Sequence, residues 1–527
     1  MKNISSFVLI LLVSLWIVLF DNVSFFKQLM GVYPFGLEYA PFLLSQVVVL
    51  SLIFMLIFTF LDWKYTLKPI LIFMLILTSI QNYFMTTYNI LVDKTMIENV
   101  LQTDSSEAMD LINLTLFAHL FFLGILPSWF VYRSSVISGG IKQIIWTKIK
   151  SFVVIIFLIW LMLFSFSKHY TSFFREHKVI RFYINPLDGF FCFATYLNEK
   201  FASLDVPFEV VGLDAKQGER KKRNVVIMVV GEAVRADHFA LNGYARETNP
   251  LMTKEEIVNF SNVSSCGTTT AISVPCMFSV YKKSSYNSSR GINSENVLDV
   301  LNRSGVEVLW RDNNSDSKGV AVRLKYESYK SEERNTVCDI ECRDIGMLVG
   351  LEKEIASTNK DIIIVLHQMG NHGPAYYKRY PKEFEKFQPA CQNNQLEYCT
   401  QKEIANSYDN ALLYTDYFLS NVVSLLKKYD KSTTQAAMLY VADHGESLGE
   451  GGFYLHGLPY FMAPDAQTHV PMLMWFSKNY IINKEKLMIQ RDKEWTHDNI
   501  FSTLLGLFSV ESTVYKEDDD ILKIGEI

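Results

Sequence analysis

Long apolar runs fill the first third of the chain, and mixed sequence with short apolar segments fills the rest. A helix needs about 20 predominantly apolar residues to cross the hydrocarbon core of a bilayer. No small-x-small cleavage site follows the first run, so we expect a retained anchor and not a cleaved signal peptide. Five runs come near the required length and are predicted to be transmembrane helices: residues 4–20, 40–61, 68–86, 111–131 and 150–167.

Basic residues are unevenly distributed among the loops between these runs. The loops on the side of the N-terminus carry Lys64, Lys68, Arg133, Lys142, Lys148 and Lys150, whereas the opposite loops are mainly acidic. Cytoplasmic loops carry an excess of Lys and Arg. The N-terminus is therefore predicted to be cytoplasmic, and five spans then place the C-terminal part outside.

Short apolar segments alternate with helical patterns after residue 223, which is typical of a largely parallel sheet in an α/β layer fold. The clearest helical pattern covers residues 401–428. The predicted strands are residues 224–230, 306–310, 361–366, 436–442 and 470–476.

Three regions follow from these patterns. An interfacial segment rich in aromatic and charged residues, ending in a polar linker, separates the membrane part from the α/β part. The predicted domains are a five-helix transmembrane domain at 1–167, the interfacial segment and linker at 168–222, and a soluble α/β domain at 223–527.

Charge and cysteine content narrow the functional classes. Fifty basic and 55 acidic residues leave a net charge of −5, which argues against a nucleic-acid partner. Six of the seven cysteines form close pairs without the two-residue spacing of zinc sites, so disulfides in an oxidising compartment are favoured. Cys192 is expected to be a free thiol in apolar surroundings. The predicted disulfides are Cys266–Cys276, Cys338–Cys342 and Cys391–Cys399.

Polar residues follow several predicted strands at their carboxyl ends, where open α/β sheets build their sites. Glu232 follows the first strand, and Asp443 and His444 follow the fourth. These are oxygen and nitrogen ligands of the kind that zinc accepts, and the hydroxyl of Thr270 can supply a fourth. The metal would then activate that hydroxyl as a nucleophile toward phosphorus.

The threonine belongs to the run Thr268–Thr270, which lies between the paired Cys266 and Cys276. A stapled Ser/Thr-rich turn without catalytic function is the alternative. The joint placement of the metal ligands favours the nucleophile.

Other polar residues have several interpretations. His372 and His456 could bind a second metal, donate a proton to a leaving group or contact a substrate phosphate. Asn99, Thr103 and Glu107 recur every four residues, so one helix would place them on one face, which could equally be a solvated surface. The remaining histidines singled out are interpreted as structural: His238, His367, His469 and His497.

Long segments around these residues resemble the phosphoethanolamine transferases of Gram-negative inner membranes, within the alkaline phosphatase/sulfatase superfamily. The resemblance covers essentially the whole chain and includes the lipid A-modifying and mobile colistin resistance enzymes. The segments that carry it are VVGEAVRADHFALNGYARETNP (229–250), SCGTTTAISVPCMFS (265–279), WRDNNSDSKGV (310–320), HQMGNHGPAYYKRYP (367–381), YDNALLYTD (408–416), ADHGESLGE (442–450) and YLHGLPYFMAP (454–464).

The resemblance implies an alkaline-phosphatase-like soluble domain in the periplasm and a role for each matching residue. Thr270 would be the nucleophile that becomes phosphoethanolaminated and, with Glu232, Asp443 and His444, would bind a catalytic zinc, with a second ion left open. The residues implied to contact substrate are Lys318, His372, His456, Asn99, Thr103 and Glu107.

The implied reaction transfers phosphoethanolamine from membrane phosphatidylethanolamine to a phosphate of lipid A in two steps. Polymyxin resistance would follow, because the added amine reduces the negative charge that polycations bind. Three alternatives remain: another acceptor such as core sugar or periplasmic glucan, a phosphoglycerol transferase of the same superfamily, and a membrane-anchored scaffold. The intact ligand set argues against the scaffold.

Overall fold

The computed structural model describes residues 3–103, 105–137, 141–203, 206–219 and 221–523. The chain divides into two compact units, which are Met1–Lys94 with Ile112–Thr195 and Thr95–Leu111 with Tyr196–Ile527. The segment Thr95–Leu111, which falls within the predicted transmembrane domain, thus belongs to the unit that contains the sheet.

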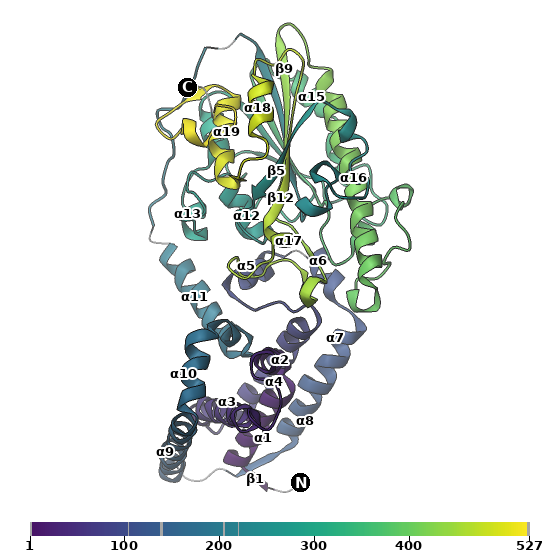
Figure 1. Ribbon diagram of the computed structural model, residues 1–527. Coiled ribbons are helices and arrows are strands. Elements are labelled where there is room, and N and C mark those ends of the chain that lie inside the picture. Colours follow the sequence, from purple (N-terminus) through teal and green to yellow (C-terminus); the bar gives the residue numbers. More distant parts are fainter. Residues whose placement is uncertain (1–2, 104, 138–140, 204–205, 220, 524–527) are drawn as a thin grey trace. The chain divides into compact units, whose positions relative to one another are not determined.

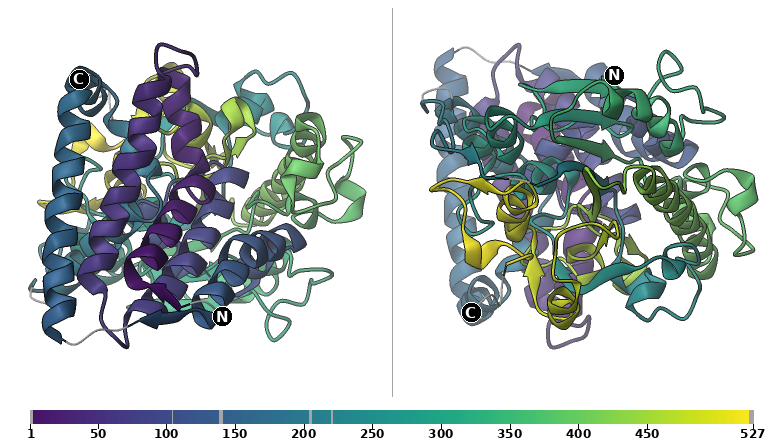
Figure 2. Two further views of the ribbon diagram at one scale, coloured as in Figure 1. Left: turned by 90° about the horizontal axis from the view of Figure 1, so that it is seen from below. Right: turned by 90° about the horizontal axis from the view of Figure 1, so that it is seen from above.

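The first unit is helical, and its purple and blue helices lie side by side (Figure 2, left). Within the described residues, four helical stretches are long and apolar enough to cross a membrane: Ala40–Phe60, Leu67–Thr87, Leu114–Arg133 and Lys142–Ser165. The helices α1 and α2 are bent by 58° and make a fifth span if the pair is counted as one. The bounds are α1 Ser6–Phe20, α2 Val23–Val32, α3 Ala40–Leu61, α4 Leu67–Thr87, α7 Leu114–His119, the π-helix η1 Leu120–Ile125, α8 Leu126–Arg133 and α9 Ile141–Ser165.

The bend between α1 and α2 is held by buried polar side chains. Asn22 Nδ2 donates to Asn185 O at 2.8 Å, and Thr78 Oγ1 donates to Asp21 Oδ2 at 2.7 Å. These bonds satisfy polar groups that are buried within the helices and shielded from water. The helix of the fifth predicted run starts earlier than residue 150. Helix α9 begins at Ile141, and its first half is basic.

The second unit is built on an eight-stranded sheet in the order β13-β5-β12-β9-β4-β8-β6-β7. The strands from β9 to β7 are mutually parallel, whereas β12 pairs antiparallel with both β9 and β5. The bounds are β4 Arg223–Gly231, β5 Ile257–Ser264, β6 Glu307–Asp312, β7 Lys325–Ser328, β8 Ile362–His367, β9 Thr434–Ala442, β12 His469–Phe476 and β13 Trp495–Thr496.

Helices cover both faces of this sheet, with α15 and α16 on one side and α12 and α19 on the other (Figure 1). The central strand β4 is therefore buried along almost its whole length. Helix α16 starts with a capping box between Thr400 and Glu403, close to the predicted start at residue 401. The bounds are α12 Thr270–Met277, α15 Leu351–Ala356, α16 Gln401–Lys427 and α19 Ile500–Leu507.

All five predicted strands of the soluble part are present, and the α/β fold is confirmed. The prediction of a largely parallel sheet is confirmed. Among the strands of this sheet that the structure describes, β12 runs against the others, whereas β5 is antiparallel to β12 and so shares the direction of β9. Strand β5 alternates buried and half-exposed positions and was not predicted.

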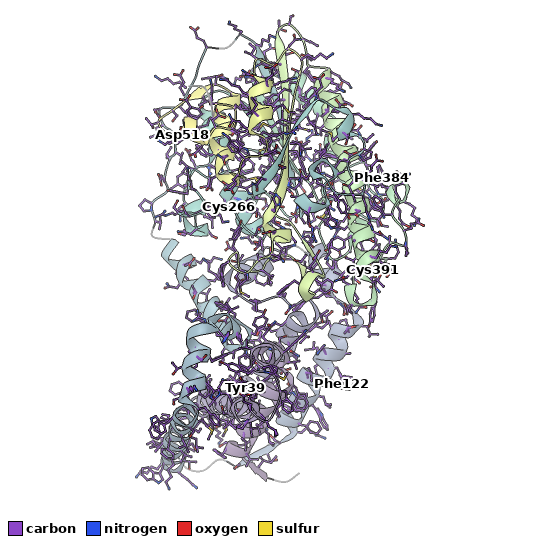
Figure 3. All side chains as sticks on the ribbon, viewed as in Figure 1. Tyr39, Phe122, Cys266, Phe384, Cys391 and Asp518 are labelled. Carbon is purple, nitrogen blue, oxygen red and sulfur yellow. A yellow bond between two sulfur atoms is a disulfide. The ribbon has the colours of Figure 1, made fainter. Side chains whose placement is uncertain are left out.

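The cysteine pairs are bonded as predicted. In Figure 3, Cys266 lies near α12 and Cys391 lies near α16. Cys192 is free and buried.

Candidate active site

Helix α12 begins at Thr270, and two links hold its first turn in place. The Cys266–Cys276 disulfide joins the preceding turn to the helix. Ser273 Oγ donates to Asp443 O at 2.5 Å, which ties the helix to the carboxyl end of β9. The Thr270 side chain therefore points from a fixed helix start toward the ends of the central strands.

The hydroxyl of Thr270 contacts two of the predicted ligands. Its Oγ1 donates to Glu232 Oε2 at 2.9 Å and lies 3.3 Å from His444 Nε2. Asn314 Nδ2 donates to the same Glu232 oxygen at 2.8 Å. Glu232 and His444 are fully buried, so these contacts form in a site that is largely shielded from water.

Asp443 completes a compact group with Glu232 and His444. Its Oδ1 accepts hydrogen bonds from the backbone of Ala233 at 3.2 Å and of His444 at 2.8 Å. Its Oδ2 is buried, lies 3.5 Å from His444 Nε2 and has no hydrogen-bond partner among the described residues.

One potential ligand atom from each of Glu232, Asp443 and His444 lies within 4.8 Å of the other two. A buried carboxylate oxygen without a donor costs free energy unless a cation is near. Two carboxylates, an imidazole and the adjacent hydroxyl therefore fit a divalent metal ion.

His444 is oriented to present a lone pair to this group. Its Nδ1 lies 2.8 Å from Gly445 O, and a carbonyl can only accept, so Nδ1 carries the proton. Burial lowers the pKa of this imidazole, which keeps it neutral. Nε2, the atom nearest Thr270 Oγ1, is then unprotonated, as a metal ligand requires.

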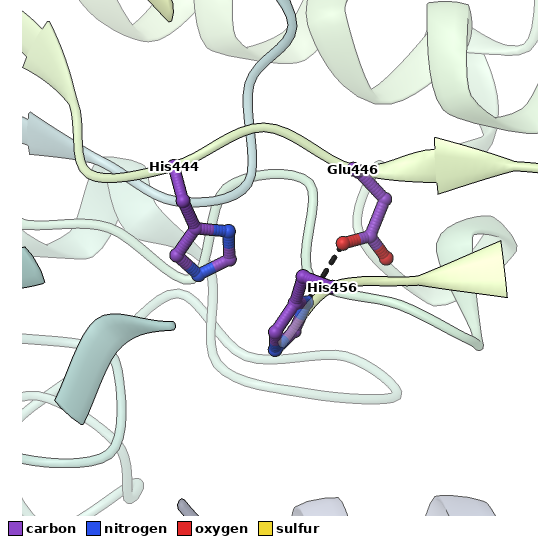
Figure 4. Close-up of side chains that lie close together, drawn as sticks. All are labelled: His444, Glu446 and His456. Atoms are coloured by element: carbon purple, nitrogen blue, oxygen red, sulfur yellow. Dashed lines mark hydrogen bonds and ion pairs between the residues drawn. The ribbon is translucent and has the colours of Figure 1, made fainter. Parts of the chain in front are cut away.

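A second group of potential ligands shares His444 and adds Glu446 and His456 (Figure 4). His456 Nδ1 donates to Glu446 Oε2 at 2.7 Å, and Tyr376 Oη donates to Glu446 Oε1 at 2.7 Å. The ring centroids of His444 and His456 are 4.3 Å apart. The Glu446 carboxylate thus orients His456 beside the first group.

His372 extends this cluster of imidazoles. Its ring centroid lies 5.4 Å from that of His456, and its Nδ1 lies 2.8 Å from Gly373 O. Burial lowers the pKa of His372 well below its usual value, so this imidazole is neutral with the proton on Nδ1. The structure thus brings His372 and His456 together beside the predicted ligands.

Gly370 allows the chain before His372 to approach Glu232 closely. Its φ is 51°, and a Cβ built there would lie 2.9 Å from Glu232 O. Any residue with a side chain would be strained at this position, and its Cβ would push the backbone of Glu232 away.

Lys318 lies in the loop that follows β6, the same loop that carries Asn314. Its Nζ donates to Gln102 O at 3.2 Å and to Ser315 O at 3.0 Å. The bond to Gln102 joins this loop to the segment Thr95–Leu111 of the same unit. The side chain is therefore placed beside that segment, and among the described residues it makes no hydrogen bond or ion pair with Thr270, Glu232, Asp443 or His444.

The predicted face of Asn99, Thr103 and Glu107 is not a single helix. Helix α5 (Lys94–Gln102) ends before Thr103, and Glu107 falls in α6 (Ser105–Leu111), with its side chain outside the described residues. Thr103 Oγ1 donates to Asn99 O at 2.8 Å, so this hydroxyl satisfies a backbone carbonyl in the last turn of α5. The regular spacing carried no information about this break.

The four other histidines have structural partners. His497 accepts from Cys266 N at 3.1 Å through Nδ1 and donates to Ala442 O at 3.0 Å through Nε2. Burial lowers the pKa of His497 to about 4, so it remains neutral and can support the threonine turn in this way. The remaining pairs are His238 with Asp409, His367 with Asp312 and His469 with Ser261.

Two residues beside the site were missed in the sequence. Asn314 follows the end of a predicted strand, as the ligands do, and that position could have identified it. Glu446 lies two residues after His444, but its importance depends on His456, which approaches from a different loop. No local pattern reveals that contact.

Comparison with known proteins places this site in a family. The sulfatase family matches residues 224–510, and the family described as phosphoethanolamine transferase EptA/EptB matches residues 50–201. The phosphatidylethanolamine transferase Mcr-2 of Escherichia coli is 43% identical over 98% of this chain and 97% of its own length. The chain belongs to the phosphoethanolamine transferases.

Other members of the family agree along the whole chain. The phosphoethanolamine transferase EptA of Escherichia coli K12 is 36% identical over 98% of this chain and 96% of its own length. The structure of the integral membrane lipooligosaccharide phosphoethanolamine transferase A of Neisseria meningitidis superposes with a TM-score of 0.94, at 34% identity over 99% of both chains. This phosphoethanolamine transferase is a multi-pass protein of the bacterial inner membrane, with its catalytic domain in the periplasm.

Proposed function

We propose that this enzyme transfers phosphoethanolamine from phosphatidylethanolamine to a phosphate of lipid A, with Thr270 as the covalent carrier. Of the relatives named above, Mcr-2 is a phosphatidylethanolamine transferase, EptA is a phosphoethanolamine transferase, and the Neisseria meningitidis protein is a lipooligosaccharide phosphoethanolamine transferase. The observation that carries the proposal is the position of Thr270. This residue begins helix α12, and its buried hydroxyl donates to Glu232 beside His444.

In the first step, Thr270 Oγ1 forms a bond to the phosphorus of phosphatidylethanolamine. The bond from phosphorus to the diacylglycerol oxygen breaks, the hydroxyl proton leaves toward Glu232 Oε2, and the departing oxygen takes up a proton. His456, held by Glu446 through Nδ1, is the proposed proton donor to that oxygen and gives the proton from Nε2. Backbone N–H groups at the start of α12 favour the negative charge of the transferring group.

In the second step, a phosphate oxygen of lipid A attacks the phosphorus of the phosphothreonine. The bond from phosphorus to Thr270 Oγ1 breaks, the threonine oxygen takes its proton back from Glu232, and His456 takes up the proton of the attacking phosphate hydroxyl. Because the same hydroxyl leaves and returns, the two substrates can use the site one after the other.

Zinc is the proposed metal, held by Glu232, Asp443, His444 and the Thr270 oxygen. When bound, it would lower the pKa of the attacking hydroxyl and stabilise charge on the transferring group. A second ion beside this group would be held by Glu446 and His456, because the one unprotonated nitrogen of His444 faces the first metal.

The remaining predicted residues are proposed to bind substrate. Lys318 would contact the substrate phosphate, and His372 would lie beside the phosphoethanolamine group. Asn99, Thr103 and Glu107 would bind the donor lipid from the segment between the third and fourth predicted spans. The bond from Lys318 to Gln102 supports this grouping, since it brings Lys318 to the end of α5.

Mass spectrometry of lipid A tests the function. Cells that express the enzyme should gain lipid A species heavier by one phosphoethanolamine group, located on a phosphate, and should tolerate higher polymyxin concentrations. Unmodified lipid A together with phosphoethanolamine on core sugar or on periplasmic glucan would establish a different acceptor. A phosphoglycerol adduct would show that phosphatidylethanolamine is not the donor.

Glu446→Gln is expected to lower the transfer rate about 10- to 100-fold, as loss of a partner that orients a site imidazole does. The amide removes the charge that orients and supports His456. Rates should be measured with phosphatidylethanolamine in detergent micelles, together with the melting temperature.

Tyr376→Phe is the matched control, because it removes one hydrogen bond to Glu446 and leaves the contact with His456 intact. It should change the rate only a few-fold, within the cost of one hydrogen bond. Equal rates for Glu446→Gln and the wild type would contradict the assigned role of Glu446.

A further inference from the structure

A cavity of about 720 Å³ lies within the membrane unit, far along the chain from the catalytic residues. Its walls come from the start of α1, the end of α3, the start of α4 and the first half of α9. These are the helix ends on the cytoplasmic side. Ligand sites typically enclose about 300–1,000 Å³, so the cavity is large enough for a lipid headgroup.

Cationic side chains outnumber carboxylates in the described lining. Lys64, Lys68 and Lys148 line the cavity with a single acidic residue, Asp62. None of these lysines forms an ion pair in the described part of the chain. The cavity therefore carries excess positive charge, which attracts an anion.

Lys148 is the most telling of the three. It is only 9% exposed. Among the described residues its Nζ donates to Phe60 O at 3.3 Å, lies 4.0 Å from the centroid of the Trp63 ring and is attracted by Asp62 without forming an ion pair. Burying an ammonium group costs several kcal/mol unless it is paired. An anion in the cavity would supply the missing countercharge.

Hydroxyl groups offer further donors to the same space. Thr59 lines the cavity and is 4% exposed, and its Oγ1 has no hydrogen-bond partner among the residues described. Lys68 Nζ donates to Ser134 O at 2.6 Å and to Tyr132 O at 3.1 Å, which fixes its position and leaves a third proton. The starts of the long helices α1, α4 and α9 also line the cavity and favour negative charge.

We propose that this cavity binds a phosphate-bearing anion, the headgroup of an anionic phospholipid of the cytoplasmic leaflet. Basic pockets between transmembrane helices on this side of a membrane suit such headgroups. Trp63 and Tyr65 belong to the lining and are typical of the membrane interface, and Phe7, Ile10 and Ile144 provide apolar wall for acyl chains. The site is independent of the transfer reaction.

Native mass spectrometry of the full-length protein in detergent tests the site, with phosphatidylglycerol as the probe and phosphatidylethanolamine as the zwitterionic reference. The wild type should retain phosphatidylglycerol in preference to phosphatidylethanolamine. The triple variant Lys64→Gln, Lys68→Gln, Lys148→Gln should bind it about 100-fold more weakly, at about 1 kcal/mol for each lysine near anionic lipid.

The control variant Arg133→Gln, Lys142→Gln, Lys150→Gln removes the same charge from the same side of the membrane but from residues that do not line the cavity. It should bind phosphatidylglycerol like the wild type. Thr59→Val, a smaller change, should weaken binding several-fold, within the cost of one hydrogen bond to a charged group, and keeps the test valid if the triple variant does not fold.

Glycerol 1-phosphate is added in a parallel arm to separate the two sources of phosphate. Binding of this soluble phosphate with the same lysine dependence and an affinity equal to that of the lipid would support the site and overturn the lipid as its source. Equal lipid binding by both triple variants, with no effect of Thr59→Val, would overturn the proposal.

Discussion

Thr270→Ala should lower phosphoethanolamine transfer by a factor on the order of 10⁴ or more, since removal of a catalytic nucleophile typically has an effect of this size. The variant lacks the oxygen that donates to Glu232 and lies 3.3 Å from His444 Nε2. Lipid A from cells that express it should be unmodified. Intact-protein mass spectrometry after incubation with phosphatidylethanolamine should show an adduct on the wild type and none on the variant.

Two further substitutions serve as controls for this result, one at Thr269 and one at Thr270 itself. Thr269→Val removes a buried hydroxyl that has no hydrogen-bond partner in the described structure, one residue before the nucleophile. It should therefore retain transfer. Thr270→Ser keeps the oxygen and should keep part of the activity. Lipid A modification by a well-folded Thr270→Ala protein would show that the covalent route is wrong.

Asp443→Asn should lower zinc affinity by more than about 100-fold, because even substitutions outside the ligand shell cost 10- to 100-fold. The amide replaces a buried carboxylate whose Oδ2 has no hydrogen-bond partner among the described residues, and it brings N–H donors where a cation is expected. Metal analysis of the purified enzyme should show little zinc in the variant. Transfer should fall in parallel.

Asp416→Asn is a matched control within the same unit. Asp416 is also buried, but it accepts from the backbone of Leu251 at 2.7 Å and of Met252 at 3.0 Å. The variant should lose about 1–3 kcal/mol of stability, because one of these two backbone hydrogen bonds is lost, and should keep its zinc. Full zinc content in Asp443→Asn, or equal loss in both variants, would contradict the ligand assignment.

Periodicity and strand-end residues were sufficient for most of the architecture. Apolar runs long enough to cross a bilayer became helices, and the five predicted strands of the soluble part became β4, β6, β8, β9 and β12. Burial on both faces makes a central strand such as β4 continuously apolar, which is why it is visible in the sequence. Parallel strands end at one edge of the sheet, and this places Glu232, Asp443 and His444 close together.

Features that depend on contacts between distant segments were not visible in this way. The reversed direction of β12, the break between α5 and α6, and the bend after α1 each depend on partners far along the chain. The bend, for example, is bonded to Asn185, more than 160 residues away. Local patterns carry the preferences of a segment and not the identity of its neighbours.

The amino-acid sequence alone determined the membrane helices, the α/β class, the cysteine pairs and the types of residue that form the proposed metal site. These follow from local physics, namely the length of apolar runs, strand periodicity and close cysteine spacing. Only the tertiary structure decided which hydroxyl meets the carboxylates, that Glu446 orients His456, and that three lysines line one cytoplasmic cavity. Those facts are distances between side chains far apart in the chain, and only packing sets such distances.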